Sequence, residues 1–166
     1  MGEFAIWRSI PVGESTAWVD QDDYAMVSKW RWHVSSGSRT LYATRNLHYR
    51  NGAHHQTSMH RMLMLPDPGL EVDHSNGNGL DNRRANLRTC TKRDNVRNQA
   101  PRGGASSYKG VHWHKRERVW HGRISYDGRL HHLGGFRDEI DAALAYDLAA
   151  IREFGEFART NFLRRQ

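Results

Sequence analysis

The sequence predicts a protein of the α+β class that is built from two small domains. Residues 99–107, which read Gln-Ala-Pro-Arg-Gly-Gly-Ala-Ser-Ser, lack hydrophobic periodicity and have the composition of a linker. Before this segment, short strands rich in aromatic and β-branched residues alternate with turns. After it, a strand-rich stretch leads into one long amphipathic helix. We therefore expect domains at residues 1–98 and 108–162.

The composition excludes several classes of protein. The chain has 166 residues, of which 37% are hydrophobic and 26% are charged, so a disordered acidic tail is excluded. It contains no apolar run of about 18 residues, which excludes a membrane protein, and its N-terminus lacks the features of a signal peptide. Cys90 is the single cysteine, which excludes a disulfide framework and a Cys-x-x-Cys zinc site. A cytoplasmic location is expected.

The charge balance indicates a polyanionic partner. The chain carries 25 Lys and Arg against 18 Asp and Glu, which gives a net charge of +7. Within residues 83–102 one acid, Asp94, stands against a cluster of bases: Arg83, Arg84, Arg88, Lys92, Arg93, Arg97 and Arg102. Such clustering is typical of phosphate contact and favours nucleic acid, although a basic surface can also serve solubility alone.

The first domain is expected to begin with short strands and two short helices. The strands lie at residues 4–7, 16–19, 30–34 and 41–47. The stretch Asp20-Gln-Asp-Asp23 can cap a short helix that runs through Lys29. Met59, Met62 and Leu63 have the spacing of a buried helix at 58–65 that Pro66 ends. The tryptophans of this region are expected in the core: Trp7, Trp18, Trp30 and Trp32.

Residues 71–98 carry the pattern that points to chemistry. A strand at 71–75 bears Asp73 and His74, a polar loop follows, and a second strand near 86–89 precedes a helix from about Lys92. A hairpin packed against a helix can bring four separated side chains to one point: Asp73, His74, Asn86 and Asn95. Carboxylate and amide oxygens suit a hard divalent cation such as Mg²⁺, and a histidine can accept a proton from water. These residue types fit phosphodiester hydrolysis.

Three other kinds of site do not match the residues of this segment. A calcium loop starting at Asp73 needs Gly at its sixth position and Glu at its twelfth, where the chain has Asn78 and Arg84. Histidines at paired zinc-ligand spacing and a glycine-lysine phosphate loop are missing. A turn rich in Asp, Asn and Gly with an incidental histidine remains the simpler alternative.

The segment from Met59 to Asn98 resembles the HNH endonucleases, in particular the branch related to phage and intron-encoded homing enzymes. The matching motifs are His60-Arg61, Val72-Asp-His74, Gly77-Asn-Gly-Leu-Asp-Asn-Arg83, Asn86-Leu-Arg88 and Asn95-x-x-Asn98. The resemblance implies a ββα-metal fold in which His74 is the general base, while Asp73 and Asn95 hold one Mg²⁺ or Mn²⁺ ion. It also implies that Asn86 braces the loop and orients His74. For His60 we expect a structural or phosphate contact.

The second domain is expected to contain a three-stranded sheet and one helix. The strands lie at 108–114, 118–126 and 129–133, the last two joined by the hairpin signal Asp127-Gly128. A helix at 137–154 is capped by Asp138 and closed by Gly155. Its packing face is predicted to consist of four aliphatic residues: Ile140, Leu144, Leu148 and Ile151. In the second strand, Trp120 and Ile124 should face the helix, whereas His121, Arg123 and Ser125 should point away.

This domain resembles the DNA-binding domain of plant ethylene-response factors. The resemblance is carried by Tyr108-Lys-Gly-Val111, Trp120, Ile124, Leu133-Gly-x-Phe136, Glu139-x-Asp-Ala-Ala-x-Ala-Tyr-Asp147 and Asn161-Phe162. It implies that the sheet enters the major groove. The residues that would then face DNA are Lys109, His112, His114, Arg116, Arg123, Ser125 and His132. Histidines replace arginines at 112 and 114 and a tryptophan at 132, and Arg123 replaces an acid, so the base preference does not transfer.

Together these observations predict a metal-dependent endonuclease that acts on double-stranded DNA and is targeted by its C-terminal domain. In the first domain, phosphate contacts are expected from Arg83, Arg84, Arg88, Arg93 and Arg97. One active site would nick DNA, so a double-strand break would require a homodimer or a second encounter. A phage origin would place the protein in the cytoplasm of a bacterial host. The alternative is a catalytically inactive regulator that only binds DNA.

Overall fold

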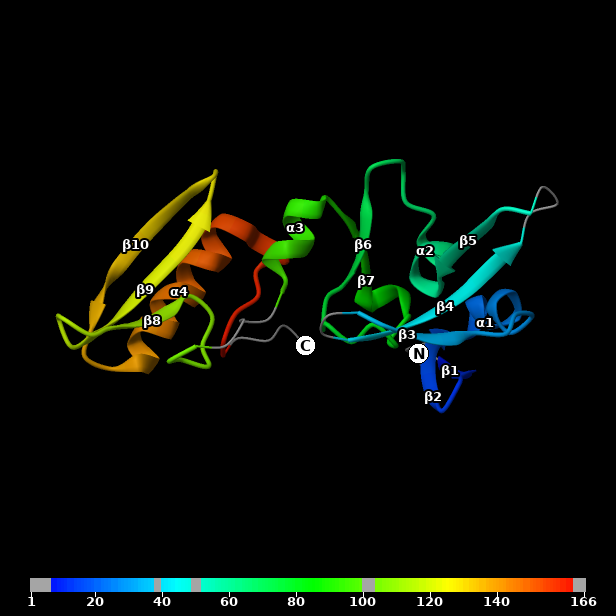
Figure 1. Ribbon diagram of the computed structural model, residues 1–166, viewed down its shortest axis with the longest axis horizontal. Coiled ribbons are helices and arrows are strands. Elements are labelled where there is room, and N and C mark those ends of the chain that lie inside the picture. Colours follow the sequence, from blue (N-terminus) through cyan, green and yellow to red (C-terminus); the bar gives the residue numbers. More distant parts are fainter. Residues whose placement is uncertain (1–6, 38–39, 49–51, 100–103, 163–166) are drawn as a thin grey trace, which may run out of the picture. The chain divides into compact units, whose positions relative to one another are not determined.

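A computed structural model describes residues 7–37, 40–48, 52–99 and 104–162 (Figure 1). The protein is of the α+β class, as predicted. It divides into two compact units, Met1–Asn95 and Val96–Gln166, and the division falls inside helix α3. Residues 4–6 of the first predicted strand and residues 100–103 of the predicted linker lie outside the described residues. No helix in the described ranges is long and apolar enough to cross a membrane.

The first unit is built from small antiparallel sheets with short helices between them. Its first part contains β1 (Trp7–Val12), β2 (Ser15–Asp20), α1 (Gln21–Val27), β3 (His33–Ser36), β4 (Leu41–His48) and β5 (His54–Ser58). Its second part contains α2 (Met59–Met64), β6 (Glu71–His74), a 3₁₀ turn η1 (Arg84–Asn86), β7 (Leu87–Cys90) and the start of α3 (Lys92–Arg97). Strands β1 and β2 form one hairpin, β3–β4–β5 form a second sheet, and β6 and β7 form the hairpin predicted to carry the chemistry.

The core of the first unit lies between these sheets and the two helices. Ile10 and Val12 of β1 and Ala17 and Val19 of β2 form the inner face of the first hairpin and are buried. They belong to one apolar cluster with Trp32, Met59, Leu63, Val72 and Leu87. The hairpin β6–β7 therefore rests on a core built from residues far away in the sequence.

The prediction that all four tryptophans of this region are in the core is wrong. Only Trp32 is buried, whereas Trp7, Trp18 and Trp30 are 51%, 40% and 44% exposed. Alternation along β2 explains Trp18, because Ala17 and Val19 point inward and the residue between them must point outward. The exposed rings still have partners: Trp7 packs edge-on against Trp18 at 5.9 Å, and the Arg45 guanidinium lies 3.6 Å from the Trp30 ring.

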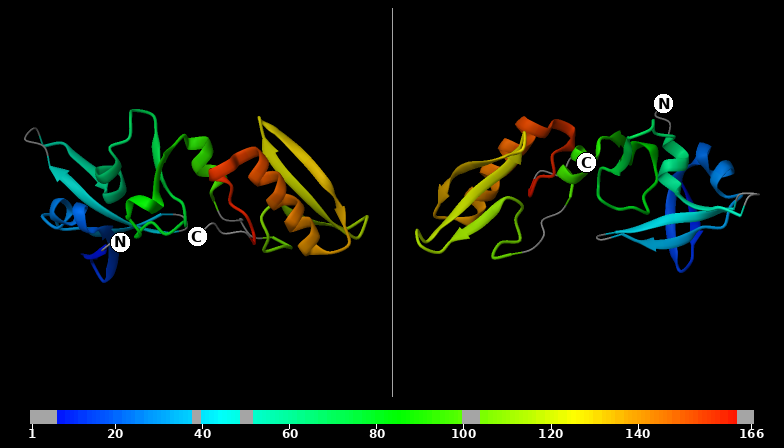
Figure 2. Two further views of the ribbon diagram at one scale, coloured as in Figure 1. Left: turned by 180° about the vertical axis from the view of Figure 1, so that it is seen from behind. Right: turned by 45° about the horizontal axis from the view of Figure 1, so that its top comes forward.

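The second unit is a three-stranded antiparallel sheet covered on one face by a helix, as predicted. The strands are β8 (Val111–His114), β9 (Val119–Tyr126) and β10 (Arg129–Phe136), in the order β10–β9–β8. Helix α4 (Glu139–Phe154) runs along one face of this sheet, and a 3₁₀ turn η2 (Gly155–Phe157) follows it (Figures 1 and 2). Asp127 and Gly128 have φ angles of 50° and 71°, which fits the predicted tight hairpin turn. The Asp138 carboxylate accepts a hydrogen bond from the Ile140 N–H at 2.6 Å and caps the helix.

The predicted packing face of α4 is wrong. Ile140, Leu144, Leu148 and Ile151 are 48%, 43%, 68% and 38% exposed. The buried side of the helix consists mainly of small residues and one tyrosine: Ala142, Ala143, Tyr146, Ala149 and Ala150. A Cβ atom added at Gly122 of β9 would lie 3.3 Å from the Ala142 carbonyl oxygen. The helix backbone thus lies so close to the sheet that only small side chains fit at most of the contact.

A buried carboxylate on α4 fastens the C-terminal segment to the second unit. Asp147 is 1% exposed and accepts hydrogen bonds from the backbone and side-chain nitrogens of Asn161 at 2.7 and 2.9 Å and from the Phe162 N–H at 2.9 Å. Asn161 in turn accepts from the Lys109 N–H at 2.7 Å. These bonds join α4, the chain end and the entry to β8.

Candidate active site

The hairpin β6–β7 and helix α3 position the predicted metal ligands. Asp73 lies on β6 opposite Arg88 of β7, and His74 lies opposite Leu87. The amide nitrogen of Asn95 on α3 donates a hydrogen bond to the Glu71 carboxylate at 2.5 Å. Since Glu71 and Asp73 are two residues apart on one strand, they share a face, so α3 lies against the strand face that bears Asp73. The sequence analysis did not single out Glu71, although its two-residue offset from Asp73 is a signal for it.

The Asp73 carboxylate is engaged by an arginine. Arg88 donates from Nε and Nη2 to the same oxygen of Asp73, at 3.0 and 2.7 Å. The two side chains are only 14% and 7% exposed, so the pair lies largely out of water. Asp73 and the amide oxygen of Asn95 form an oxygen donor set of the kind that Mg²⁺ and Mn²⁺ prefer. The residues therefore fit a hard divalent cation, and that cation would compete with the Arg88 guanidinium for Asp73.

His74 lies in a cluster of rings supplied by β4, α2 and β6. Its ring centroid is 4.9 Å from that of His60 and 5.8 Å from that of Tyr42. His60 is held by Ser58, whose hydroxyl oxygen is 2.9 Å from its Nε2 atom. Local sequence does not identify Tyr42 as a member of this cluster, because its part depends on the packing of β4 against the hairpin.

Burial keeps both histidines of this cluster neutral at neutral pH. It lowers the pKa of His60 to about 3, and the neighbouring His74 and Arg61 act in the same direction. It also lowers the pKa of His74, while the Asn82 amide, Asp73 and Asp81 partly oppose this effect. Asn82 is fully buried beside the ring. A neutral imidazole is the form that can accept a proton.

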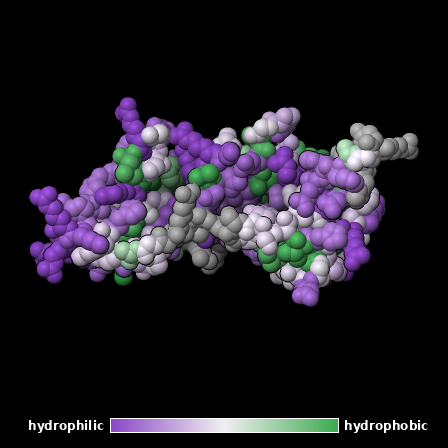
Figure 3. Space-filling view, viewed as in Figure 1, coloured by the Kyte–Doolittle hydropathy of each residue, from purple (hydrophilic) through white to green (hydrophobic). Residues whose placement is uncertain are grey.

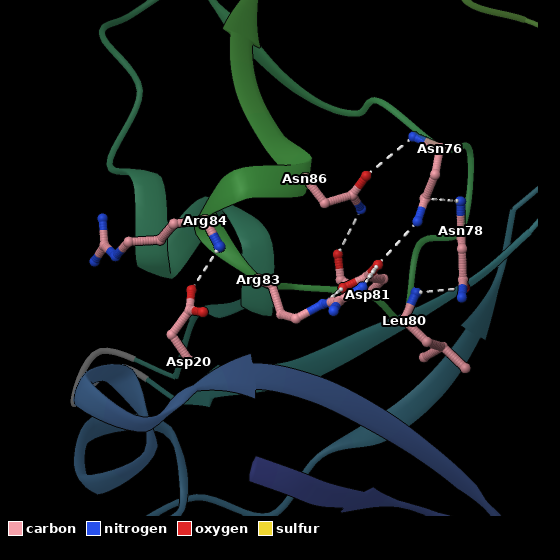
Figure 4. A network of polar contacts seen from close by, with 8 residues as sticks. All are labelled: Asp20, Asn76, Asn78, Leu80, Asp81, Arg83, Arg84 and Asn86. Carbon is pink, nitrogen blue, oxygen red and sulfur yellow. Dashed lines mark hydrogen bonds and ion pairs between the residues drawn. The ribbon is translucent and has the colours of Figure 1, made fainter. Parts of the chain in front are cut away.

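The loop between β6 and β7 is held by a network centred on Asp81 and Asn86 (Figure 4). The Asn86 side chain accepts from the Asn76 N–H at 3.0 Å and donates to the Asp81 carbonyl at 2.8 Å, so it spans the loop. The Asp81 carboxylate accepts from Asn76 Nδ2 at 2.8 Å and from Arg83 Nε at 2.7 Å. Burial alone would raise the pKa of Asp81, but these donors, Arg83 foremost, lower it below its ordinary value.

Several arginines expected to contact phosphate form ion pairs within the chain. Arg83 pairs with Asp81, Arg88 pairs with Asp73, and Arg84 donates to both oxygens of Asp23 at 2.8 Å. The Arg84 N–H also donates to Asp20 at 2.7 Å, and Asp20 makes no side-chain cap to α1, contrary to expectation. Arg97 lies over the Phe154 ring at 4.5 Å. Several arginines of the basic cluster at residues 83–102 therefore take part in contacts within the fold, which a count of charges does not show.

In the second unit, the structure places five of the residues expected to face DNA on the outer face of the sheet. Trp120 and Ile124 pack toward α4, so the residues between and beside them on β9 point away from the helix. The residues on this outer face are His112 and His114 of β8, Arg123 and Ser125 of β9 and His132 of β10. Arg116 lies exposed in the β8–β9 turn. Lys109 lies elsewhere, because its ammonium group donates to the Arg97 carbonyl.

Comparison with known proteins identifies the family. A family model described as HNH endonuclease matches residues 64–97, a range that contains Asp73, His74, Asn86 and Asn95. Protein 3.8 of Escherichia phage T7 is 32% identical over 93 residues, which cover 55% of this chain and 75% of the phage protein. The chain belongs to the HNH endonuclease family. An uncharacterized HNH endonuclease of Acanthamoeba polyphaga mimivirus, L560, is 29% identical to this HNH endonuclease over 153 residues, covering 87% of the chain and 74% of the viral protein.

This HNH endonuclease also has partial similarity to plant proteins. The APETALA2-like protein 2 of rice is 41% identical over 64 residues, which cover 39% of this chain and 15% of the plant protein. An AP2-like ethylene-responsive transcription factor of Arabidopsis thaliana is 38% identical over 65 residues, covering 39% of this chain and 13% of the plant protein. The matched length is that of a single small domain.

Proposed function

We propose that the protein is a metal-dependent endonuclease that hydrolyses phosphodiester bonds of double-stranded DNA. The observation that carries this proposal is the hairpin β6–β7 with α3, which presents Asp73, His74 and Asn95 within the residues matched by the HNH family model. Asp73 and Asn95 would hold Mg²⁺ or Mn²⁺, and such an ion, when bound, neutralises charge on the leaving oxygen.

In this mechanism His74 is the general base. Its buried, neutral imidazole accepts a proton from the water that attacks phosphorus, which leaves a 5′-phosphate and a 3′-hydroxyl. Asn86 is a positioning residue, because it ties the two ends of the loop that begins beside His74. Buried Asn82 and the rings of Tyr42 and His60 limit the movement of the His74 imidazole. For His60 this favours a structural role.

The second unit is assigned to DNA binding. Support comes from the partial similarity to plant AP2-like proteins and from the polar and basic outer face of the sheet β8–β9–β10. In this assignment residues 1–98 form the nuclease domain and 108–162 the DNA-binding domain. Phosphate contacts in the first domain would come from arginines that exchange an internal carboxylate for a phosphate: Arg83, Arg84 and Arg88. The remaining phosphate contacts of this domain are assigned to Arg93 and Arg97.

Kinship with a phage protein supports a homing-type or phage-associated role in the cytoplasm of a bacterial host. One active site per chain implies nicking, and a double-strand break would require a homodimer or a second binding event. Mapping cleavage positions on both strands of a phage genome separates these modes.

The deciding experiment compares wild-type protein with His74→Ala on supercoiled DNA, with Mg²⁺ and with EDTA. Loss of a general base lowers cleavage about 10²–10⁴-fold and leaves ground-state phosphate contacts in place, so DNA affinity should change little. His33→Ala, at an exposed histidine on β3, is the matched control and should cleave normally. Cleavage by His74→Ala within a few-fold of wild type would refute the assigned base. Failure of wild type to cleave under any divalent metal would favour the DNA-binding regulator instead.

A further inference from the structure

The outer face of the sheet in the second unit carries a cluster of histidines that the nuclease mechanism does not use. His114 ends β8, Glu117 lies in the turn that follows, and His121 lies on β9. One ligand atom of each of these residues lies within 4.8 Å of the others. All three project from a single β8–β9 hairpin, so their spacing depends on local structure.

The cluster converges on one carboxylate oxygen. Glu117 Oε2 lies 2.9 Å from His121 Nε2 and 3.6 Å from His114 Nδ1. The two imidazole rings are stacked nearly parallel, with centroids 4.5 Å apart and an interplanar angle of 9°. Two nitrogen atoms and one oxygen atom therefore lie within 4.8 Å of one another. Because imidazole lone pairs lie in the ring plane, the accessible His114 ring must turn out of the stack before both rings can bind one ion.

His121 is set into the sheet surface, and this fixes one ligand of the cluster. Its side chain is 8% exposed, while those of His114 and Glu117 are 34% and 58% exposed. His132 covers it edge-on, with ring centroids 4.5 Å apart. Because His121 is held in place and the side chains of His114 and Glu117 are accessible, an ion can enter this site from solvent.

We propose that His114, Glu117 and His121 form a binding site for a transition-metal ion of the zinc class. Two imidazole nitrogens and a carboxylate oxygen are a known zinc donor set, and bond lengths near 2.0–2.2 Å place tetrahedral ligands about 3.3 Å apart. The two distances to Glu117 Oε2 bracket that separation. Imidazole nitrogens do not suit Mg²⁺, so this site is chemically distinct from the oxygen site at Asp73 and Asn95. Water would complete the coordination.

Binding requires two local rearrangements. Arg123 Nη2 lies 3.4 Å from His121 Nδ1, and the Glu117 N–H donates to His114 Nδ1 at 3.2 Å. With Nε2 on the metal, His121 carries its proton on Nδ1, so the Arg123 guanidinium must swing away from it. The half-exposed position of Arg123 and the exposed turn of Glu117 permit both movements.

The test is a titration of the full chain with Co²⁺ in excess Mg²⁺, followed by the d–d absorption of Co²⁺, with Zn²⁺ then added as competitor. The expected result is one site whose spectrum Zn²⁺ abolishes. His114→Ala and Glu117→Gln change accessible side chains and should each weaken Co²⁺ binding at least about 10-fold, since even residues behind the ligands affect metal affinity by that factor.

Three control variants make the outcome decisive. His33→Ala and Glu14→Gln alter an exposed histidine and an exposed glutamate of the first unit and should leave Co²⁺ binding unchanged. Asp73→Asn should also leave it unchanged, because it alters only the oxygen site. The proposal is overturned if no Co²⁺ band appears. It is equally overturned if Asp73→Asn abolishes the band while His114→Ala and Glu117→Gln retain it.

Discussion

The ion pair between Asp73 and Arg88 places a cationic side chain on a residue expected to bind a cation. In a largely buried setting neither partner can be replaced by water at low cost, so the pair holds the carboxylate in one orientation. The same contact opposes metal entry, because the ion must displace the guanidinium. Metal affinity and the strength of this ion pair are therefore linked.

Arg88→Ala should tighten metal binding. An exposed ion pair is worth up to about 1 kcal/mol and this buried one is worth more, so its removal would lower the Mn²⁺ midpoint at least about fivefold. Titration calorimetry with Mn²⁺ in the absence of DNA measures this without interference from phosphate contacts. Arg31→Ala, at an exposed arginine, is the control and should leave the midpoint unchanged. A weaker Mn²⁺ affinity in Arg88→Ala would show that the arginine supports the ligand instead of competing for it.

The neutral state of buried His60 predicts loss of stability in acid. Its pKa is about 3 in the folded protein, against an ordinary value near 6.5 in the unfolded chain. Between these values the unfolded chain binds a proton that the folded protein does not, so stability falls as pH drops below about 6.5, by up to about 1.4 kcal/mol per pH unit. His60→Gln should reduce this dependence in urea unfolding at pH 7 and pH 5, whereas exposed His33→Gln should not. An unchanged pH dependence in His60→Gln would contradict a buried neutral imidazole.

At the residue level, the sequence predicts which site residues lie on the hairpin and the helix, but not which side chains from elsewhere in the chain contact them. Asp73, His74 and Asn86 lie on or beside strands that local pattern could predict. The pairing of Arg84 with Asp23 joins residues 61 positions apart, and charge clustering contains no information on such contacts. The ring contact of Tyr42 with His74 likewise arises only when β4 packs beside the hairpin.

At the scale of elements, the sequence predicts helix α4 correctly but predicts the wrong side of it to pack against the sheet. Both of its sides are apolar, and hydrophobicity favours the side with the larger residues. The side with the smaller residues packs instead, because Gly110 and Gly122 allow the helix to approach the sheet closely. A Cβ at Gly110 would lie 2.0 Å from the Tyr146 ring. The sequence thus predicts the element and its caps, while the depth of packing depends on the opposing sheet.

Asp147→Ala should loosen the second unit without affecting the first. Hydrogen bonds to a buried charged group contribute about 1.5–3 kcal/mol each. Asp147 accepts three of them, so a cost of at least about 4 kcal/mol is expected. Hydrogen exchange followed by mass spectrometry should show faster exchange in β8–β10 and α4 and unchanged exchange in β1–β7. Asp141→Ala, at an exposed position of the same helix, is the control. Unaltered exchange in Asp147→Ala would mean that the C-terminal segment is not needed for the stability of the unit.

At the scale of the whole molecule, the chain contains separate cores. The apolar cluster around Val12 and Met59 lies in the first unit, and those around Ile124 and Val111 lie in the second. On the face seen in Figure 3, hydrophilic residues predominate and the hydrophobic areas are small and separate. Each unit thus has the internal packing that independent domains have.

Truncation to Met1–Ala105 should retain cleavage and lose affinity. The deletion removes 11 basic and 8 acidic residues, a net loss of three positive charges, so bulk electrostatics largely remain. Loss of a linked second binding site should weaken DNA binding by about 10²-fold or more. Nicking assays and binding titrations at fixed salt measure the two properties separately. Full affinity and an unchanged cleavage pattern in the truncated chain would show that the second unit does not target the nuclease.

The alanine-packed face of α4 also determines where the second unit tolerates change. Because the helix rests on the sheet through Ala142 and Ala150, enlarging these residues would force the layers apart. Leu144 and Leu148 face outward, so polar substitutions there remove little buried area. The side of the helix with the larger aliphatic residues is therefore the one open to redesign: a tag, a label or a solubilising charge can be placed there while the sheet and its outer surface keep their geometry.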